Sequence, residues 1–492
     1  MLDVVDWPAI TNGEPEAWLY FYEDFLSVCD NKLRKLTGSY YTPPEVVSSM
    51  VRLVHDILRS SRFGLTTGLA SPVVSIADPA TGTGTFLLGL LRRIAETVRE
   101  DEDEGAVAEA ITQAAKRLVA FELQLGPFAV AQLRMMAEIT ALTGAEPKVA
   151  PQMFVTNTLG NPQDDEGWIP GILAPIAKSR KEANRIKREH PITVVIGNPP
   201  YKEKANGMGG WIEQEKLNDW QSPREWKAGA HAKHLRNLYV YFWRWATWKV
   251  FDHGPGKKEG IVCFITLAGF LGGRGFQKMR DYLRRTANDI WVIDCTPEGH
   301  RPGVPTRIFQ GVQQTVCIVI VSRRPKKKTK TEEPATVRFT ALPAGPREAK
   351  FAALAKVTIT GKQWIECPSD WRAPFLPAST GAWATYPKLE ELFVYHESGT
   401  MPGRTWIIAL DAESLRRRWQ ALISAKLDEK EKLFHPHLSK TGPGDRQVQK
   451  VVSKGPPGFA DRPTRIANES GACEAPIRYG FRTLDRQWVI PD

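Results

Sequence analysis

The stretch from Val194 to Tyr201 constrains the fold of this chain more than any other. It reads Val-Val-Ile-Gly-Asn-Pro-Pro-Tyr, and the β-branched apolar run at 192–196 is typical of a strand buried in a parallel sheet. Gly197 allows a sharp turn where this strand ends, at the edge of an open α/β sheet where ligands bind. The stretch therefore predicts an α/β fold in which a strand delivers a polar loop to a ligand site.

The loop after this strand combines hydrogen-bond acceptors with an aromatic ring. Pro199 and Pro200 fix the backbone and remove two N–H donors, so the local carbonyls of Asn198 and Pro199 are held outward. An exocyclic amino group of a nucleobase has two N–H donors, and accepting both lets its nitrogen attack an electrophilic methyl group. Tyr201 is then placed to stack on a base that has left the duplex, a contact worth roughly 1–3 kcal/mol. The alternative for the tetrapeptide alone is a structural turn with an incidental tyrosine.

Asn-Pro-Pro-Tyr after an apolar strand resembles the catalytic motif of the amino-methyltransferases, above all the adenine-N6 DNA methyltransferases. Along the chain, the cofactor segments come first, the catalytic motif second and the recognition region last. This order resembles the gamma-type arrangement of these enzymes. The chain is most similar to the methyltransferase part of Type ISP and related fused restriction-modification and phage-defence enzymes, strongly over 36–322 and weakly over 323–492. The resemblance implies a class I S-adenosylmethionine-dependent methyltransferase, which is a Rossmann-like α/β fold with a seven-stranded, mostly parallel sheet, followed by an α+β target-recognition region.

Residues 73–88 read as a strand, an acidic residue, a glycine loop and a helix from about Thr85. The glycines allow a ligand to approach the backbone, and the start of the helix offers free N–H groups and a positive dipole end. Leu87 replaces the third glycine of Gly-x-Gly-x-x-Gly and an acid precedes the glycines, which suits the α-amino group of S-adenosylmethionine better than the pyrophosphate of a nicotinamide cofactor. The expected cofactor contacts here are Asp78, Ala80, Gly82 and Gly84.

Two further strands add to the predicted cofactor site. The strand at 117–122 ends in Glu122, an acid placed to grip a ribose diol. Near residues 154–159 the family often has an acidic residue that holds the adenine amino group, and this chain offers Asn157 there, which still permits hydrogen bonding.

A turn that opens a helix lies ahead of the glycine loop. Thr42 is suited to cap this helix, with Pro43 at its first position and Glu45 completing a capping box. An ordinary capped helix explains this pattern by itself. In the family, however, Tyr-Thr-Pro helps hold the methionine part of the cofactor, so the resemblance adds Tyr41, Thr42 and Pro43 to the cofactor contacts.

Segments after the catalytic loop complete the predicted domain. Apolar runs at 260–267, 289–295 and 314–322 are expected to be strands, the last two paired as an antiparallel hairpin. By resemblance Phe309 is a second wall of the base pocket, although core packing explains it equally well. Residues 202–236 are either a mobile loop that closes over the base or a disordered excursion, and the polar residues 162–191 are expected to be a surface excursion.

Charge and proline content indicate a basic linker at 323–335. The resemblance implies that the catalytic domain lies before it, at 37–322, and a partial target-recognition and DNA-binding domain after it, at 336–492. A helical cap is expected at 1–36. In that last part the basic run at 426–454 either contacts phosphates or is a solvated face.

Composition is consistent with a DNA-acting protein of the cytoplasm, associated with the nucleoid. A formal net charge of +11 favours a polyanionic partner, although a merely basic soluble protein is equally common. The six cysteines form no Cys-x-x-Cys pair, so no metal site or disulfide framework is expected. No apolar run reaches the roughly 18 residues that a membrane span needs, so no membrane partner is expected.

The predicted function is methyl transfer from S-adenosylmethionine to adenine N6 of a flipped-out base in double-stranded DNA, in restriction-modification or phage defence. Asn198, Pro199, Pro200 and Tyr201 are the predicted catalytic residues. One alternative is a methyltransferase subunit that is active only with other restriction-modification or phage-defence subunits. The other is a methyltransferase of RNA bases or protein glutamines, since Asn-Pro-Pro-Tyr also serves such enzymes.

Overall fold

The computed structural model describes residues 42–491 with gaps at 147–150, 165–173, 227, 255–257, 300–306, 310–311, 325–332, 388, 394–404, 435–437, 440–441, 444–447, 449–464 and 483–484. The chain divides into two compact units, Met1–Ser379 and Thr380–Asp492. The predicted helical cap at 1–36 and most of the predicted basic linker lie outside the described residues.

A nine-stranded sheet forms the centre of the first unit, with strand order β3-β2-β1-β4-β5-β7-β6-β8-β9. Among the first seven strands, only β7 runs antiparallel to its neighbours β5 and β6, so the predicted hairpin and the mostly parallel sheet are confirmed. The strands are β1 Ile76–Asp78, β2 Leu118–Glu122, β3 Gln152–Val155, β4 Val194–Gly197, β5 Gly260–Leu267, β6 Asp289–Asp294, β7 Val316–Arg323, β8 Thr336–Ala341 and β9 Ile365–Glu366.

The sheet continues past residue 322, where the sequence places the edge of the catalytic domain. β8 pairs in parallel with β6, with Asp289 opposite Thr336, and β9 pairs with β8. Arg338 of β8 also forms an ion pair of 2.8 Å with Asp289, whose side chain is only 6% exposed. The outer edge of β6 is thus covered by chain that the sequence assigns to the recognition region, and the first compact unit extends to Ser379.

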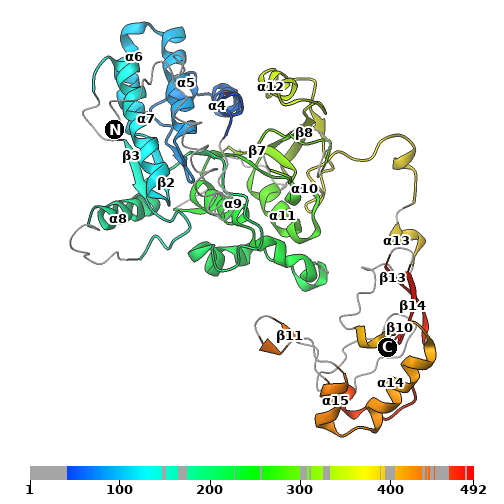
Figure 1. The fold of residues 1–492 in the computed structure, drawn as a ribbon. Coiled ribbons are helices and arrows are strands. Elements are labelled where there is room, and N and C mark those ends of the chain that lie inside the picture. The colour runs from blue at the N-terminus through cyan, green and yellow to red at the C-terminus, as the bar shows by residue number, and fades with distance from the viewer. Residues whose placement is uncertain are drawn as a thin grey trace, which may run out of the picture. The chain divides into compact units, whose positions relative to one another are not determined.

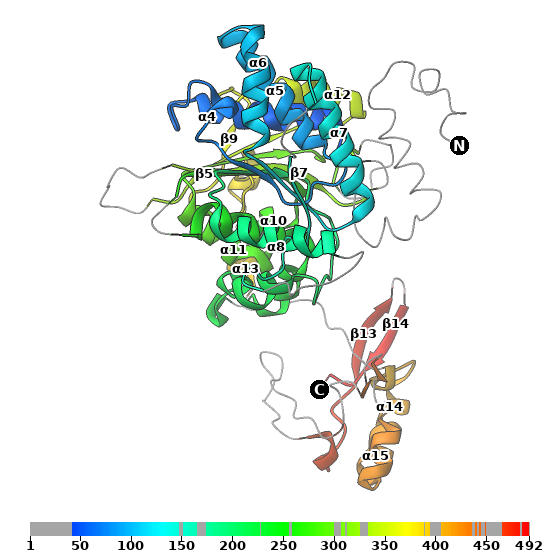
Figure 2. The same cartoon turned by 90° about the vertical axis from the view of Figure 1, so that its left-hand side faces the viewer.

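Helices cover both faces of this sheet, with α4–α7 and α12 on one face and α8, α10 and α11 on the other (Figure 2). The apolar positions of α5 repeat at helical spacing, which gives the buried stripe Leu87, Leu90, Leu91, Ile94 and Val98. The helices are α4 Pro44–Arg59, α5 Thr85–Asp101, α6 Glu104–Ala115, α7 Leu125–Thr143, α8 Ala174–Glu189, α9 Leu238–Thr247, α10 Gly269–Gly272, α11 Gln277–Thr286 and α12 Arg347–Ala355.

Two local predictions are corrected. Pro43, not Thr42, is the N-cap of α4, and no side chain caps that helix, because the Thr42 hydroxyl accepts a hydrogen bond from Asn198 instead. Part of the predicted surface excursion at 162–191 is α8, which buries Ala183, Ile186 and Lys187. The basic composition of α8 hides this buried stripe.

The second unit has its own small sheet and core. Three strands lie in the order β10-β14-β13, and they pack with two helices around Trp406, Leu415, Trp419, Leu422 and Ile490. Its main elements, labelled in Figure 1, are β10 Ile408–Ala409, α14 Ala412–Ser424, α15 Leu427–Leu433, β13 Ile477–Arg482 and β14 Asp485–Val489. Three shorter elements are α13 Leu389–Leu392, β11 Leu438–Ser439 and β12 Gly442–Pro443.

Among the described residues, no helix is long and apolar enough to cross a membrane. In the same part of the chain, no three His, Cys, Asp or Glu side chains are grouped so that they would hold a metal ion.

Candidate active site

Topology brings the predicted site residues to one edge of the sheet. β1 lies between β2 and β4 and is parallel to both, so the carboxyl ends of these three strands are neighbours. Asp78 ends β1, Glu122 ends β2 and Gly197 ends β4. Val194, Val195 and Ile196 are fully buried, as expected of the strand that carries the Asn-Pro-Pro-Tyr loop.

Gly197 lies directly against Asp78. A Cβ atom at position 197 would be 2.8 Å from Asp78 Oδ1 and 3.5 Å from Pro79 Cδ. Glycine is therefore required at position 197 so that the end of β4 can pack closely against the end of β1. This requirement adds to that of the turn, which the sequence predicts.

The glycine loop folds around the two acids. Gly82 and Gly84 have φ angles of +56° and +86°, which favour glycine, and a Cβ at Gly84 would meet Ala131 Cβ of α7 at 3.1 Å. The amide of Gly82 donates to Glu122 Oε2 at 2.9 Å. The loop thus links the ends of β1 and β2 and begins α5 at Thr85, as predicted.

Asp78 is a buried carboxyl group that is suited to a cationic ligand. It is 0% exposed, and among the described residues its Oδ2 has no hydrogen-bond partner, while Oδ1 accepts from the amide of Ala80 at 3.1 Å. Burial raises the pKa of Asp78 to about 8; the Ala80 hydrogen bond opposes this shift and the neighbouring Glu122 adds to it. An ammonium group beside Oδ2 would offset the cost of ionising this carboxyl.

Glu122 is held by backbone donors. Its Oε1 accepts from the amide of Gln124 at 2.8 Å, and Oε2 accepts from Gly82. Burial raises the pKa of Glu122, and these backbone hydrogen bonds oppose that rise. The carboxylate is therefore fixed in direction at the end of β2.

Asn198 is joined to the segment that precedes α4. Its Nδ2 donates to Thr42 Oγ1 at 3.0 Å, and Thr42 is 6% exposed. Pro43 is also buried. Tyr41, the third residue of the predicted Tyr-Thr-Pro contact, lies outside the described residues.

Tyr201 and Phe309 form an edge-to-face pair. Their ring centroids are 5.9 Å apart with an interplanar angle of 77°, and both residues are nearly buried, with exposures of 5% and 3%. The hydroxyl of Tyr201 donates to the carbonyl of Ile265 in β5 at 3.3 Å. The structure thus brings Phe309 to the aromatic ring of the Asn-Pro-Pro-Tyr loop, and because both rings belong to the buried core, its role as a wall of the base pocket stays a prediction.

Asn157 follows the end of β3 and is exposed. Its Oδ1 accepts from the amide of Leu159 at 3.0 Å, and its backbone carbonyl accepts from the buried Lys187 Nζ at 2.7 Å. The side-chain oxygen therefore shapes its own turn, and a contact from Asn157 to a cofactor adenine stays a prediction.

One candidate residue is missing from the sequence prediction. Leu123 directly follows Glu122 and is 64% exposed, which is unusual for a large apolar side chain at the end of a buried strand. An apolar surface beside an acid that is predicted to bind a ribose is suited to packing against a purine ring. Its signal in the sequence was the apolar residue after the strand-ending acid.

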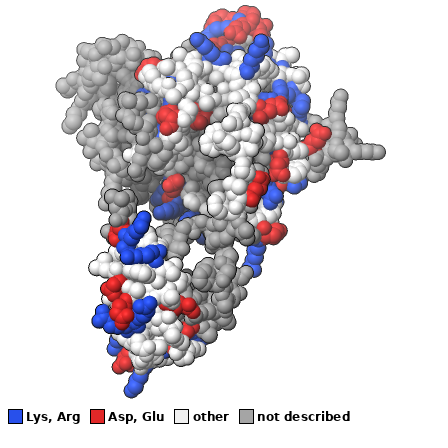
Figure 3. All heavy atoms as spheres, turned by 90° about the vertical axis from the view of Figure 1, so that its right-hand side faces the viewer, with Lys and Arg blue, Asp and Glu red and all other residues white. Residues whose placement is uncertain are grey.

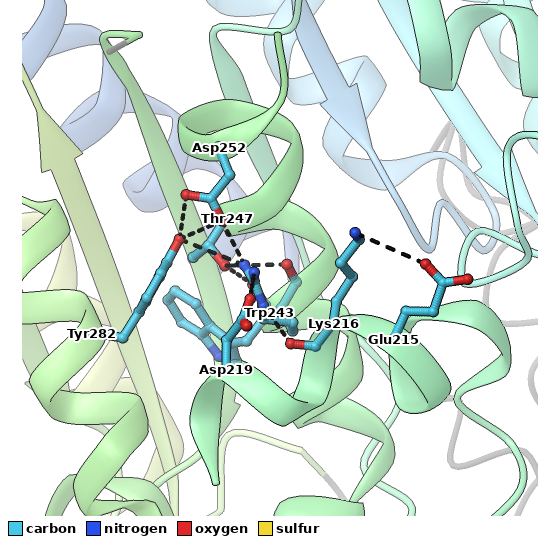
Figure 4. A network of polar contacts seen from close by, with 8 residues as sticks. Glu215, Lys216, Asp219, Trp243, Thr247, Asp252 and Tyr282 are labelled. Carbon is cyan, nitrogen blue, oxygen red and sulfur yellow. Dashed lines mark hydrogen bonds and ion pairs between the residues drawn. The ribbon is translucent and has the colours of Figure 1, made fainter. Parts of the chain in front are cut away.

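The segment after the catalytic loop is anchored by Arg244 of α9, which is 3% exposed. Its guanidinium forms ion pairs with Asp219 at 2.6 Å and Asp252 at 2.8 Å, and its Nε donates to the carbonyl of Lys216 at 3.0 Å. Figure 4 shows Tyr282 pointing toward Asp252, to which its hydroxyl donates at 2.8 Å. Residues 216–219 are thus tied to the core, in contrast to a freely mobile loop.

Comparison with known proteins identifies the family. The model of the N-6 DNA Methylase family matches residues 19–333, which is more than half of the chain. The chain belongs to this family. Membership of the N-6 DNA Methylase family implies S-adenosylmethionine as the cofactor, and this agrees with the acids and glycines at the ends of β1 and β2.

Three solved structures share the fold. The Type ISP restriction-modification enzyme LlaBIII bound to DNA has a TM-score of 0.57 at 21% identity, over 78% of this chain and 26% of that one. The DrdV–DNA complex has a TM-score of 0.59 at 18% identity, over 95% of this chain and 45% of that one. A nuclease-deletion mutant of the Type ISP enzyme LlaGI with a DNA substrate mimic has a TM-score of 0.58 at 17% identity, over 92% of this chain and 37% of that one.

This chain spans less than half the length of each of these three proteins. At such low identities the similarity establishes the shared fold. In a search of curated proteins, none matched the chain.

Proposed function

We propose that this chain transfers a methyl group from S-adenosylmethionine to adenine N6 of a flipped-out base in double-stranded DNA, within restriction-modification or phage defence. The observation that carries the proposal is the position of Asn198. Its amide is held by Thr42 at the sheet edge, in a loop that begins beside the buried Asp78 and ends at Tyr201. A methyl-donor site and an aromatic base pocket would then meet at this amide.

The acids and glycines of β1 and β2 would hold the cofactor. Asp78 would receive the α-amino group at its buried carboxylate, and Glu122 would accept from the ribose hydroxyls. The turn at Gly82, where a Cβ atom would meet nothing within 4 Å, leaves room for the methionine part against the backbone. When bound, S-adenosylmethionine supplies an electrophilic methyl group on a sulfonium.

The Asn-Pro-Pro-Tyr loop would position the target base. The carbonyls of Asn198 and Pro199 would accept the two N–H groups of the adenine amine, and Tyr201, supported by Phe309, would stack on the ring. Bound S-adenosylmethionine would supply its methyl group to the amine held by these carbonyls, with S-adenosylhomocysteine as the leaving group and the released proton passing to water, so no covalent enzyme intermediate is required. Rate enhancement would come from orientation and electrostatic positioning.

Double-stranded DNA is the proposed partner. The fold neighbours LlaBIII and DrdV are each described as complexes with DNA. Further restriction-modification or phage-defence subunits are proposed partners as well.

The test is transfer of labelled methyl from S-adenosylmethionine to unmethylated genomic DNA by the purified chain, followed by nucleoside analysis. N6-methyladenine is the expected product. Cofactor binding without transfer to DNA would point instead to a subunit that needs a partner. Transfer to RNA or protein glutamine in place of DNA would refute the proposal, and in that case deletion of the second unit, Thr380–Asp492, should spare the activity.

A further inference from the structure

Net charge alone does not locate the surface that touches DNA. On the face shown in Figure 3, a cluster of acidic side chains stands out at the top, and elsewhere the basic and acidic side chains of the described residues lie interspersed.

A cavity of about 390 Å³ lies beside the catalytic loop. Its walls are the short helices Gly229–Arg236 and Arg274–Phe276, the end of β5 at Leu267 and the start of β7. Glu203, two residues after Tyr201, also lines it. This volume falls in the range of roughly 300–1,000 Å³ that is usual for small-ligand sites, and it is large enough for one nucleotide.

The cavity is lined by basic side chains, by the side-chain amides of Asn237 and Gln314, and by the aromatic ring of Phe276. His231, His234 and Arg274 are its basic residues, and Glu203 is the one acid among the lining residues that the structure describes. The two histidine rings stack with centroids 6.5 Å apart, and His234 lies 6.4 Å from the ring of Phe276. Arginine and histidine N–H donors beside aromatic rings are the chemistry that binds a phosphate together with a sugar or base.

Backbone contacts fix this cavity to the catalytic loop. The amide of Leu238 donates to the carbonyl of Lys202 at 2.8 Å, and that of Ala205 donates to the carbonyl of Arg236 at 2.8 Å. Gly275 packs against the backbone of His231 so closely that a Cβ atom would clash with its carbonyl. The basic wall therefore holds its position relative to Tyr201.

A basic and aromatic surface lies on the elements next to this wall. Trp226 lies between Lys278 and Arg372, whose charged groups are 5.4 Å and 5.0 Å from its ring centroid. Lys278 belongs to α11, which directly follows the Arg274–Phe276 helix, and Trp226 lies three residues before the helix Gly229–Arg236. Lys278 is already paired with the buried Asp281 at 2.7 Å, so Arg372 beside Trp226 offers the further phosphate contact outside the cavity.

We propose that this cavity holds the nucleotide next to the flipped-out base on the same DNA strand, with its phosphate at Arg274, His231 and His234. The inference rests on the proposed function, because it presupposes a base extruded toward Tyr201. The strand leaves the base pocket past Glu203 and enters the cavity, so its backbone is gripped where it is most distorted. Arg274 is exposed and therefore accessible to a phosphate.

The first experiment measures binding of the full chain to duplex DNA at several salt concentrations. Arg274→Ala should lower the slope of log affinity against log salt by about 1. It should also raise the KM for DNA about tenfold while the affinity for S-adenosylmethionine stays the same. Lys116→Ala is the matched control, because Lys116 is an exposed cation before β2, at the opposite edge of the sheet.

A second measurement assigns the phosphate. In duplexes that carry the mapped target adenine, single phosphates around it are replaced by neutral methylphosphonates. One replacement next to the target should weaken binding by wild-type protein but add no further loss in Arg274→Ala. If that replacement weakens binding equally in both proteins, or the salt slope of Arg274→Ala is unchanged, the cavity does not hold this nucleotide.

Failure of one proposal can be distinguished from failure of the other, because binding to duplex DNA can be measured without methyl transfer. A chain that binds duplex DNA without methylating it contradicts the proposed function, and the salt slope still decides the role of Arg274. A chain that binds RNA but no duplex DNA contradicts both.

Discussion

Asn198 Nδ2 donates a hydrogen bond of 3.0 Å to Thr42 Oγ1, which joins two residues 156 positions apart in the chain. The NH₂ end of the Asn198 amide faces this hydroxyl oxygen, and the carbonyl end points away from it. Thr42 thus contacts the amide that we propose to be catalytic, in addition to the cofactor role that the resemblance assigns to this residue.

Removing this acceptor should impair catalysis more than cofactor binding. In Thr42→Val the shape of the side chain is kept, but the half-buried amide of Asn198 loses its hydrogen bond to Thr42 Oγ1, at a cost of about 1–3 kcal/mol. We expect kcat to fall by about 5- to 150-fold, since about 1.4 kcal/mol corresponds to a factor of ten. Thr42→Ser keeps the hydroxyl and should retain most of the activity. Equal kcat values in the two variants would rule out the positioning role.

Asn198→Ala should abolish methyl transfer and leave the affinity for S-adenosylmethionine within a few-fold. Asn198 faces Thr42, whereas the proposed cofactor acids lie on β1 and β2. Equilibrium binding of the cofactor and single-turnover methyl transfer measure the two effects separately. An equal loss of binding and transfer would contradict this division of labour.

Local patterns in the sequence predicted the elements that carry the site. The run Val194–Ile196 followed by Gly197 identified β4, and the acid and glycines after residue 73 identified β1 and the start of α5, because burial and turn geometry there depend on nearby residues. These signals predicted which residues lie at the carboxyl edge of the sheet.

Features that depend on distant contacts were not predictable. Thr42 has the chemistry of an N-cap, and only the approach of Asn198 diverts its hydroxyl. Lys187 belongs to a strongly basic helix, yet it is buried because its ammonium donates to the carbonyl of Asn157. Arg244 is similar, since its partners at 216–219 and 252 come together only in the folded domain.

Gly197→Ala should weaken cofactor binding and stability together. The added Cβ would lie 2.8 Å from Asp78 Oδ1, so either β4 or the Asp78 carboxyl must shift. Overpacking of this kind costs about 1–3 kcal/mol. Urea unfolding and cofactor titration are the measurements. Gly471→Ala is the control, since a Cβ there meets nothing within 4 Å and it should behave as the wild type does. Wild-type cofactor affinity in Gly197→Ala would show that this contact is unimportant.

The ring of Tyr201, rather than its hydroxyl, should support base flipping. Tyr201→Phe loses one hydrogen bond to Ile265, worth about 0.5–1.5 kcal/mol, but keeps the edge-to-face contact with Phe309. Tyr201→Ala loses the stacking surface, worth roughly 1–3 kcal/mol. With 2-aminopurine at the target base, we expect a fluorescence rise on binding for wild type and Tyr201→Phe, and a weaker rise for Tyr201→Ala. Equal signals from both variants would refute stacking on Tyr201.

Asp78 should make the stability of the cofactor-free protein fall as pH rises. Its usual pKa is 3.8, and burial raises the folded-state pKa to about 8. Between these values the folded state binds more protons than the unfolded state, so the free energy of unfolding decreases with pH through this range and levels off above about 8. Each unit of pKa difference corresponds to about 1.4 kcal/mol. Asp78→Asn removes this dependence, so it should gain stability relative to wild type as pH rises from 5 to 8.5.

The same carboxyl predicts proton release on cofactor binding. A cationic α-amino group beside Oδ2 lowers the pKa of Asp78, so near pH 7 a group that is mostly protonated in the free protein must ionise on binding. Calorimetric titrations with S-adenosylmethionine in buffers of different ionisation enthalpy count the protons released. We expect up to about one proton for wild type, and correspondingly fewer for Asp78→Asn, in which this position has no carboxyl to ionise. The same proton count for both proteins would show that the ammonium group binds elsewhere, even if both variants bind the cofactor.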